Sequence, residues 1–495
     1  MGRKWLRLIL PAAMMLLLSG CLFRPPDDLY RLPEMSAGYD QLTSAIKSVR
    51  AGLEMEYGIG SETAVIVSGD NTATTQLQDL DGDGKRESAV VFLRIPGAEK
   101  SLKIYIFRQI AGIYQVAGVV EGNGSAIYSV DYVDLNGSGS KELVVNWQIS
   151  TGVYQLGAYT LDELRRLPGQ NSASGTVNAF LSAEERASLL ATELLLTGCS
   201  GASESSDSYS SGYRLLDIDQ DTRTEIAVVR MDSASVGSKV EVYGWQDGAF
   251  VSLSSASLST GAVTLNQIRS NYLSGEYYPP ALYVTCTLED GTRAIDVLAY
   301  QEVTGQEQKQ LVNLSQDPET GVSRSRLQGY TEVGLTDING DYVLEIPSPK
   351  LLPTPLVTAT SNFWLIDWSQ YDEAGERHQV MTTYHNVTDS WYLVVPERWK
   401  NKITISRNDQ VLLGQREVVF SLWEGGEEPP QPFLSIYRLT GSNRAAQAAY
   451  SGRFILREEE SVIYAARFYD IGWNCGLDSA GLMENFKTIR TTWYS

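Results

Sequence analysis

The sequence contains few of the side chains that most often catalyse reactions or bind transition metals. It has two histidines and four cysteines in 495 residues. A Gly-x-Ser-x-Gly elbow, a His-Glu-x-x-His motif and a phosphate-cradling glycine loop are all absent. We therefore expect His378 and His385 to be ordinary surface or strand residues, and we predict that the protein is not an enzyme.

Basic side chains are also scarce. The 40 lysines and arginines are outnumbered by 60 aspartates and glutamates, which gives a formal net charge of −20. Because phosphate binding needs clustered lysine and arginine that displace counterions, this balance excludes nucleic acid as an expected ligand. An acidic surface is instead suited to solubility and to divalent cations.

The apolar run near the N-terminus is too short to cross a membrane. Leu8–Leu18 follows three basic residues and falls short of the about 20 apolar residues that a transmembrane helix needs. Its length and its basic flank are typical of a secretory signal. The segment Leu18–Cys21 resembles the lipobox of bacterial lipoproteins.

The lipobox resemblance implies that Cys21 is the mature N-terminus and bears two or three acyl chains. One acyl chain gives only marginal membrane binding, so a second is needed for stable anchoring. We predict a signal peptide over residues 1–20, a tether over 21–36, and a body on the extracytoplasmic face of the cell membrane. The alternative is a simple secretion signal in which Cys21 is incidental.

Lipidation of Cys21 would leave three cysteines, Cys199, Cys286 and Cys475. An odd number makes a disulfide framework unexpected. Cys286 lies in the strand-like run Ala281–Leu288 and is expected to be a buried small hydrophobic residue.

An acidic nonapeptide followed by an apolar, β-prone run occurs four times, and we call the copies the first to fourth acidic loops. Each copy has oxygen-bearing side chains at its positions 1, 3, 5 and 9. In order along the chain these residues are Asp79, Asp81, Asp83 and Glu87; Asp134, Asn136, Ser138 and Glu142; Asp217, Asp219, Asp221 and Glu225; and Asp337, Asn339, Asp341 and Glu345.

The starts of the loops are 55, 83 and 120 residues apart. Because the last spacing is about twice the first, we expect a degenerate fifth copy near Tyr277–Val284 that keeps the strand and has lost the acidic loop. The middle spacing contains an insertion at about 160–212 that is rich in glycine and serine. A capping-box pattern within it predicts a helix from Ala183 to Leu196.

The segments between the loops read as β-strands. Ser88–Arg94, Leu102–Arg108, Ile113–Val120 and Ala126–Val133 are strand candidates around the first unit. About four strands per unit of roughly 40 to 50 residues are typical of propeller blades. Before the first unit, the helical spacing of apolar residues in Gly38–Met55 predicts an amphipathic helix packed on the first blade.

These loops resemble the FG-GAP repeats of integrin α-subunit-like β-propellers, in which an Asp-x-Asp/Asn-x-Asp-Gly-x-x-Asp loop binds calcium. Glutamate replaces the last aspartate here, and the resemblance extends over about Thr63–His385. It implies a mainly β fold, with a β-propeller of about five blades over residues 37–387 and calcium in the acidic loops.

The residue pattern gives calcium a chemical basis of its own. Alternating oxygen side chains at positions 1, 3 and 5 converge when a loop turns tightly, and the glutamate at position 9 must close the site. Charge and loop glycines together predict that the first loop binds best and the second worst. The alternative is that these residues only form hairpin turns, which they favour without any ion.

Residues 388–495 differ in character and predict a small α+β domain. Strand candidates are Trp391–Val395, Pro396–Lys400, Lys402–Ser406, Glu417–Trp423, Phe433–Arg438 and Val462–Tyr469, and a helix is expected over Ser479–Thr492. The strand that leads into Pro-Glu-x-Trp-Lys resembles a domain of Firmicutes surface proteins, a resemblance that assigns no chemistry.

The function predicted from these features is a membrane-anchored module that binds a protein or a polysaccharide. Two alternatives remain: an enzyme acting on cell-wall polysaccharide, for which Asp367 and Asp372 are a weak candidate pair, and an accessory subunit of an envelope complex. Exposed aromatic residues could stack on sugar rings, but we expect Trp245, Trp364, Trp368 and Trp391 to pack in the core.

Overall fold

A computed structural model describes residues 37–110, 113–160, 187–203, 211–231, 237–330, 332–355 and 362–489. The chain is mainly β, with six antiparallel sheets and no closed barrel among these residues. The predicted signal peptide, Cys21 and the tether lie outside the described residues. In the part of the chain that is described, no helix combines the length and apolar composition needed to cross a membrane.

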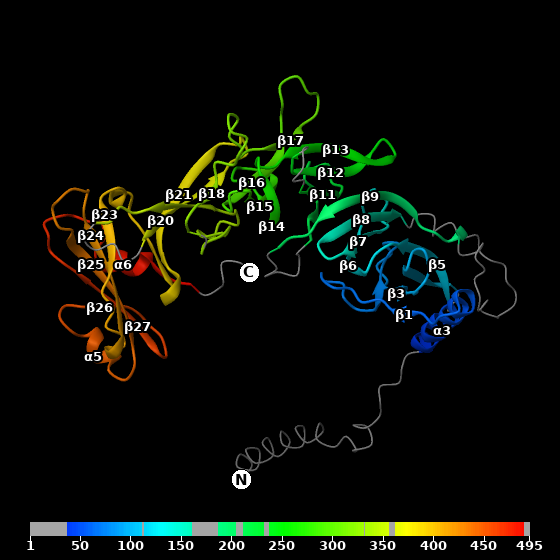
Figure 1. Cartoon of the computed structure of the whole chain (residues 1–495), viewed down its shortest axis with the longest axis horizontal. Helices are drawn as coiled ribbons and strands as arrows, with labels where there is room; N and C mark the ends of the chain where they lie inside the picture. Colours follow the sequence, from blue (N-terminus) through cyan, green and yellow to red (C-terminus); the bar gives the residue numbers. More distant parts are fainter. Residues whose placement is uncertain are drawn as a thin grey trace, which may run out of the picture.

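The predicted N-terminal helix is present as α3 (Ala37–Tyr57). Its buried residues Leu42, Ala45 and Leu53 pack against Val91 and Phe107 of the first sheet. This confirms the amphipathic helix, which covers the outer face of that sheet at one end of the molecule (Figure 1).

The first three sheets have the same meander topology, in which consecutive strands are neighbours. Their strands are β2 (Thr75–Gln78), β3 (Ser88–Arg94), β4 (Leu102–Ile110) and β5 (Ile113–Gly122), with β1 (Glu62–Thr63) also pairing with β3; β6 (Ala126–Val133), β7 (Glu142–Ser150), β8 (Val153–Thr160) and β9 (Thr192–Ser200); and β10 (Tyr213–Leu216), β11 (Glu225–Arg230), β12 (Lys239–Gln246) and β13 (Ala249–Ser257). The four strands predicted around the first unit are confirmed.

The helix predicted over Ala183–Leu196 is wrong from Thr192 onward, where the chain forms β9. This strand pairs with β8 along its whole length. Leu195 and Cys199, which alternate with exposed residues, pack between the second and third sheets. Pairing with a distant strand therefore overrides the local helical signal. The part of the insertion at 161–186 lies outside the described residues.

The fourth sheet is formed by β14 (Ala262–Tyr272), β15 (Pro280–Leu288), β16 (Arg293–Gln301) and β17 (Gln310–Asn313), with β18 (Arg326–Leu327) also beside β16. The strand expected in the degenerate copy is therefore present as β15. A short connection, residues 273–279, replaces the acidic loop between β14 and β15.

The fifth sheet contains strands from both sides of residue 388, whereas every strand of the sixth lies after it. The fifth consists of β19 (Ile346–Leu351), β20 (Trp364–Tyr371), β21 (Arg377–Asn386), β22 (Trp391–Val394) and β28 (Phe486–Thr488), and the sixth of β23 (Ile403–Arg407), β24 (Gln415–Leu422), β25 (Gln431–Thr440), β27 (Val462–Phe468) and β26 (Phe454–Glu458). Short helices connect them: η3 (Val387–Asp389), η4 (Glu397–Trp399), η5 (Val411–Leu413), α5 (Arg444–Ala448) and α6 (Ser479–Asn485).

Two sequence predictions for this region are wrong. The strand expected at Pro396–Lys400 is the helical turn η4, because Trp399 is buried and its indole N–H donates to the carbonyl of Cys475 at 2.6 Å. The helix expected to reach Thr492 ends at Asn485, where the chain becomes β28 and pairs with β22. Phe486 packs there against Trp391, with ring centroids 5.4 Å apart.

Consecutive sheets pack face to face along an arc (Figure 1). The second strand of each of the first three sheets is buried on both faces, which explains the apolar run after the first three acidic loops. In β3, Phe92 faces the second sheet while Val91 faces α3. In β15, Val284 faces the third sheet and Tyr283 faces the fifth.

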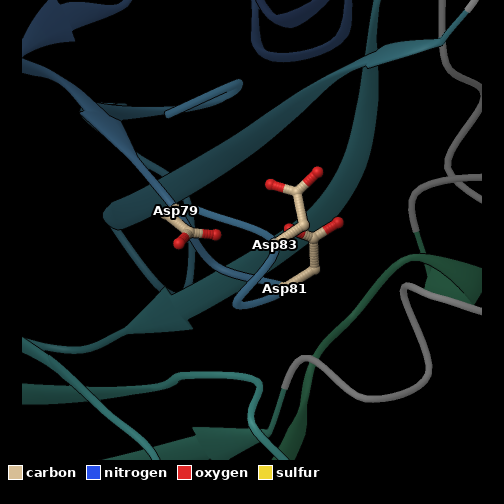
Figure 2. A group of neighbouring side chains, drawn as sticks. All are labelled: Asp79, Asp81 and Asp83. Carbon is tan, nitrogen blue, oxygen red and sulfur yellow. The ribbon is translucent and has the colours of Figure 1, made fainter. Parts of the chain in front are cut away.

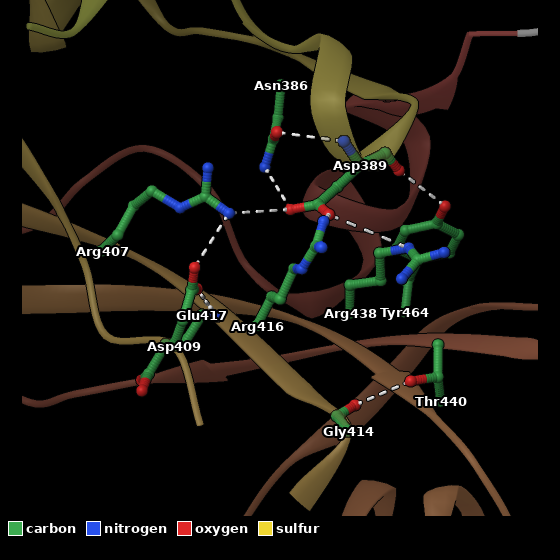
Figure 3. Close-up of polar contacts among 10 residues, drawn as sticks. All are labelled: Asn386, Asp389, Arg407, Asp409, Gly414, Arg416, Glu417, Arg438, Thr440 and Tyr464. Atoms are coloured by element: carbon green, nitrogen blue, oxygen red, sulfur yellow. Dashed lines mark hydrogen bonds and ion pairs between the residues drawn. The ribbon is translucent and has the colours of Figure 1, made fainter. Parts of the chain in front are cut away.

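A buried carboxylate joins the fifth sheet to the sixth (Figure 3). Asp389, in η3, has 1% of its side chain exposed and lies among three arginines of β23, β24 and β25. The nearest, Arg416, is 2.7 Å away, and Arg407 is 3.4 Å away. Because Arg416 lies directly opposite Arg438 in the sheet, the carboxylate also offsets a cross-strand repulsion.

We expect Asp389→Asn to lower the free energy of unfolding by about 2 to 4 kcal/mol, because removing one partner leaves the arginines uncompensated. The matched control is Asp409→Asn, which removes a half-exposed partner of Arg407 and should cost at most about 1 kcal/mol. Chemical denaturation of both variants measures the difference. Equal, small losses would contradict the role assigned to Asp389.

Candidate metal centres

The acidic loops occupy equivalent places in the sheets. The first three connect β2 to β3, β6 to β7, and β10 to β11, which are the first and second strands of their sheets. The fourth precedes β19, and its ends are joined by a bridge between Thr336 and Glu345. The repeated sequence therefore corresponds to a repeated structural position.

One hydrogen bond recurs in all four loops and sets their shape. The backbone N–H at position 6 donates to the aspartate at position 1: Gly84 to Asp79 at 3.0 Å, Gly139 to Asp134 at 2.7 Å, Thr222 to Asp217 at 3.0 Å and Tyr342 to Asp337 at 2.9 Å. These donors hold the position 1 carboxylate at the centre of the turn.

Positions 4 and 6 of every loop have a positive φ. In the first loop these are Gly82 (70°) and Gly84 (86°), but in the third they are Gln220 (65°) and Thr222 (77°). Glycine adopts this region freely and other residues do so at a cost. The third loop therefore keeps the common shape without the glycines that the sequence argument required.

Neighbouring loops touch one another. The backbone N–H of Lys141, in the second loop, donates to the carbonyl of Leu80, in the first, at 2.8 Å. A Cβ atom on Gly82 would collide with the carbonyl oxygen of Gly139. The side chain of Arg223, in the third loop, lies beside Gly137 of the second. The first three loops thus lie next to one another along one edge of the stacked sheets.

Three of the four loops bring carboxylates close enough to hold a metal ion. Within each group the candidate ligand atoms lie within 4.8 Å of one another. The groups are Asp79, Asp81 and Asp83, shown in Figure 2; Asp217, Asp219 and Glu225; and Asp337, Asp341 and Glu345. Hard oxygen ligands of this kind suit calcium, which takes six to eight of them.

The second loop closes without such a group. Its Asn136 side chain donates to Glu142 at 2.9 Å, and its Ser138 backbone N–H donates to the Asn136 side-chain oxygen at 2.8 Å. Only Asp134 and Glu142 are charged, so an internal amide contact replaces the convergence of carboxylates.

The glutamate at position 9 is buried in three loops and accepts the backbone N–H of position 2. Leu135 donates to Glu142 at 2.8 Å, Ile218 to Glu225 at 2.9 Å, and Ile338 to Glu345 at 2.8 Å. Asn339, at position 3 of the fourth loop, donates its amide to Asp341 at 2.8 Å. The third and fourth loops therefore contain both a carboxylate group and an inward closing glutamate.

The first loop departs from this arrangement. Glu87 keeps 32% of its side chain exposed and is not part of the first carboxylate group. Arg108, from β4, forms an ion pair with Asp81 and lies 4.0 Å from Glu87. Because a guanidinium at this place competes with a bound cation, the geometry favours the third and fourth loops over the first, whereas the sequence favoured the first.

No protein-family model matches the chain, and no curated protein matches it.

The electrostatics of the third and fourth loops indicate a shortage of positive charge. Burial, and then the charge of Asp219, raises the pKa of Glu225 to about 8. Burial, and then the charges of Asp341 and Asp337, raises the pKa of Glu345 to about 7. A divalent cation between these carboxylates would lower both values.

The strand that pairs with the one following each loop determines how much of the repulsion is offset. Gln370 of β20 donates its amide to Asp341 and, at 2.8 Å, to Glu345 in the fourth loop. In the third sheet the residue facing Glu225 is Gly244, which has no side chain that could donate a hydrogen bond. Neither Arg108 nor Gln370 was expected, because each comes from a strand more than 20 residues beyond its loop.

The remaining candidates lie elsewhere. His385 is buried and its pKa falls to about 3 through burial, while His378 contacts Asp372 at 2.6 Å. Asp367 pairs with Lys350. As expected, Trp368, Trp391 and Cys286 are buried. Trp245 and Trp364 are only partly buried, and Cys199 and Cys475 are also buried.

The raised pKa of Glu225 predicts a pH dependence for the metal-free protein. A carboxyl whose folded pKa exceeds its unfolded value near 4.5 stabilises the fold below that value and loses this contribution as pH rises through about 8. In chelator, the unfolding temperature should therefore fall as the pH rises from about 6 to about 9. Calorimetry at one scan rate, repeated at intervals of about one pH unit, measures this change.

Glu225→Gln should flatten this slope, since the amide cannot ionise yet still accepts the N–H of Ile218. Glu193→Gln, at an exposed position of β9, is the matched control and should leave the slope unchanged. A slope equally steep in Glu225→Gln and in the parent would contradict the assignment.

Proposed function

We propose that this protein is a lipid-anchored, extracytoplasmic module that binds calcium in its acidic loops and binds a protein or polysaccharide at a bacterial surface. The observation that supports it most is the recurrence of one loop geometry in four of the sheets, three times with convergent carboxylates. Turn formation alone does not explain why a glutamate is buried beside these carboxylates.

The first five sheets, four of which contain these loops, are, in this proposal, about five propeller-type blades of the FG-GAP kind. Four-stranded meanders that pack face to face in chain order support this reading. The helix α3 covers one end of the stack and the sixth sheet the other. The apolar faces of the end sheets are thereby buried.

Calcium fits the donors that the loops provide. The third and fourth groups contain only carboxylates, with neither histidine nor cysteine. In the first group, the Oδ1 atom of Asp79 is buried without a hydrogen-bond partner, which leaves one ligand position directed to an ion. Bound calcium would offset the mutual repulsion of these carboxylates and tie position 1 to the strand that follows the loop.

The candidate pair Asp367 and Asp372 gives little support to the alternative of a polysaccharide-cleaving enzyme. Asp367 forms an ion pair with Lys350, and Asp372 with His378. A glycosidase needs one carboxyl raised in pKa as the acid, whereas the contact with His378 keeps the pKa of Asp372 low despite partial burial. An accessory role in an envelope complex remains compatible with a binding module.

Calcium at about 1 mM should raise the unfolding midpoint relative to chelator. With dissociation constants of roughly 0.1 to 1 mM, each occupied loop contributes about 0.4 to 1.4 kcal/mol. Asp219→Asn, in the third loop, should reduce the calcium-dependent shift, while Asn136→Ala, in the second, should leave it unchanged. A midpoint indifferent to chelator, or a larger effect of Asn136→Ala, would refute the calcium assignment.

The anchor is tested separately. Metabolic labelling with a fatty-acid analogue should modify the native chain and not Cys21→Ala, because the acyl chains are attached through that sulfur. The native chain should also partition into detergent. Equal labelling of the two proteins would show that Cys21 is incidental to export.

A further inference from the structure

Four exposed tyrosines lie at the ends of the fourth and fifth sheets. Their exposed fractions are 49% for Tyr272, 72% for Tyr277, 48% for Tyr278 and 82% for Tyr342. The first three belong to the end of β14 and the connection that replaces the lost acidic loop, and Tyr342 is position 6 of the fourth loop.

Hydrogen bonds place these two segments side by side. Arg269 of β14 donates to the carbonyl of Leu335, just before the fourth loop, at 2.9 Å. Tyr283 donates its hydroxyl to the carbonyl of Tyr272 at 2.9 Å and packs in one cluster with Leu344 of the fourth loop.

The connection itself also contacts the fifth sheet. The N–H of Ser274 donates to the carbonyl of Tyr371 at 2.9 Å. The residue before Tyr371, Gln370, binds Asp341 of the fourth loop at 2.8 Å. Tyr277 and Tyr278 therefore extend from a segment anchored beside the fourth loop.

The backbone of Tyr342 adopts a strained conformation. Its φ of 71° is the conformation that Gly84 and Gly139 adopt at the same position of the first and second loops. Thr222 shares it in the third loop, but only Tyr342 exposes a large ring there. A strained backbone with an unpacked ring gives no stability in return, which is expected of a residue that contacts a ligand.

The surroundings of the tyrosines define the ligand's chemistry. Asp372 forms a backbone bridge with Ser274, and the carboxylate of Glu373 lies against Gly275. The net charge of −20 disfavours polyanions. Between residues 262 and 345, the exposed large hydrophobic side chains are these tyrosines and Val303. A protein interface needs a continuous apolar core, whereas separate rings amid carboxylates suit sugars, which offer an apolar C–H face and hydroxyl donors.

We propose that Tyr272, Tyr277, Tyr278 and Tyr342 form the binding surface for a neutral polysaccharide, whose sugar rings stack on the exposed tyrosine rings. Nearby carboxylates accept the sugar hydroxyls. This inference rests on the proposed function as a binding module and specifies both its ligand class and its surface.

The test is native affinity electrophoresis of the mature chain with Cys21→Ala, in 1 mM calcium. The gels contain hydroxyethylcellulose, arabinoxylan, galactomannan or a soluble β-glucan. At least one should retard the chain. Tyr277→Ala and Tyr342→Gly should each raise the apparent dissociation constant about three- to tenfold, the range expected for loss of one ring contact. Tyr450→Ala, 69% exposed beside α5, is the control and should bind normally.

Tyr342→Gly restores the residue usual at this φ, so its unfolding midpoint and calcium shift should be preserved or raised. This separates loss of the ligand from loss of the fold. If calcium stabilises the chain but no gel retards it, or if the tyrosine variants bind as well as the parent, the polysaccharide surface is refuted. If the native chain captures a surface protein that these variants do not capture, and no gel retards the native chain, the polysaccharide surface is refuted in favour of a protein ligand.

Discussion

Repulsion between carboxylates held in one tight turn is the constraint on which each acidic loop depends. In the first, third and fourth loops, the carboxylate atoms of each group lie within 4.8 Å of one another. The repulsion between carboxylates is offset in a different way in each loop. Arg108 supplies a positive charge in the first, the second replaces two carboxylates with Asn136 and Ser138, and Gln370 donates amide protons in the fourth. In the third, the facing residue is Gly244, so Glu225 must retain a proton or share a cation.

The stack of sheets explains why the loops keep one shape despite these differences. The first loop contacts the second through Leu80 and Lys141, and the second contacts the third through Gly137 and Arg223. A loop that changed its course would break contacts with its neighbours. The strain at Gln220 and Thr222 is therefore tolerated because the adjacent elements fix the backbone.

The sequence predicted the elements whose signals are local. Strand β3 was found because burial on both faces produces a continuous apolar run, and α3 because its apolar residues have helical spacing. Prediction from the sequence failed where pairing with a distant strand determines the local structure. Residues 192–200 pair with β8 and become β9, and Phe486 joins β22 instead of extending α6. The outward placement of Glu87 likewise depends on Arg108, which reaches the first loop from another strand. Local spacing cannot reveal such contacts.

The proposed ions at the carboxylate groups are tested most directly by anomalous diffraction from crystals soaked in terbium, a calcium substitute. We expect strong peaks among Asp217, Asp219 and Glu225 and among Asp337, Asp341 and Glu345, a weaker peak at the first loop, and none at the second. Peaks confined to other surfaces, or a peak at the second loop with none at the third and fourth, would contradict this proposal.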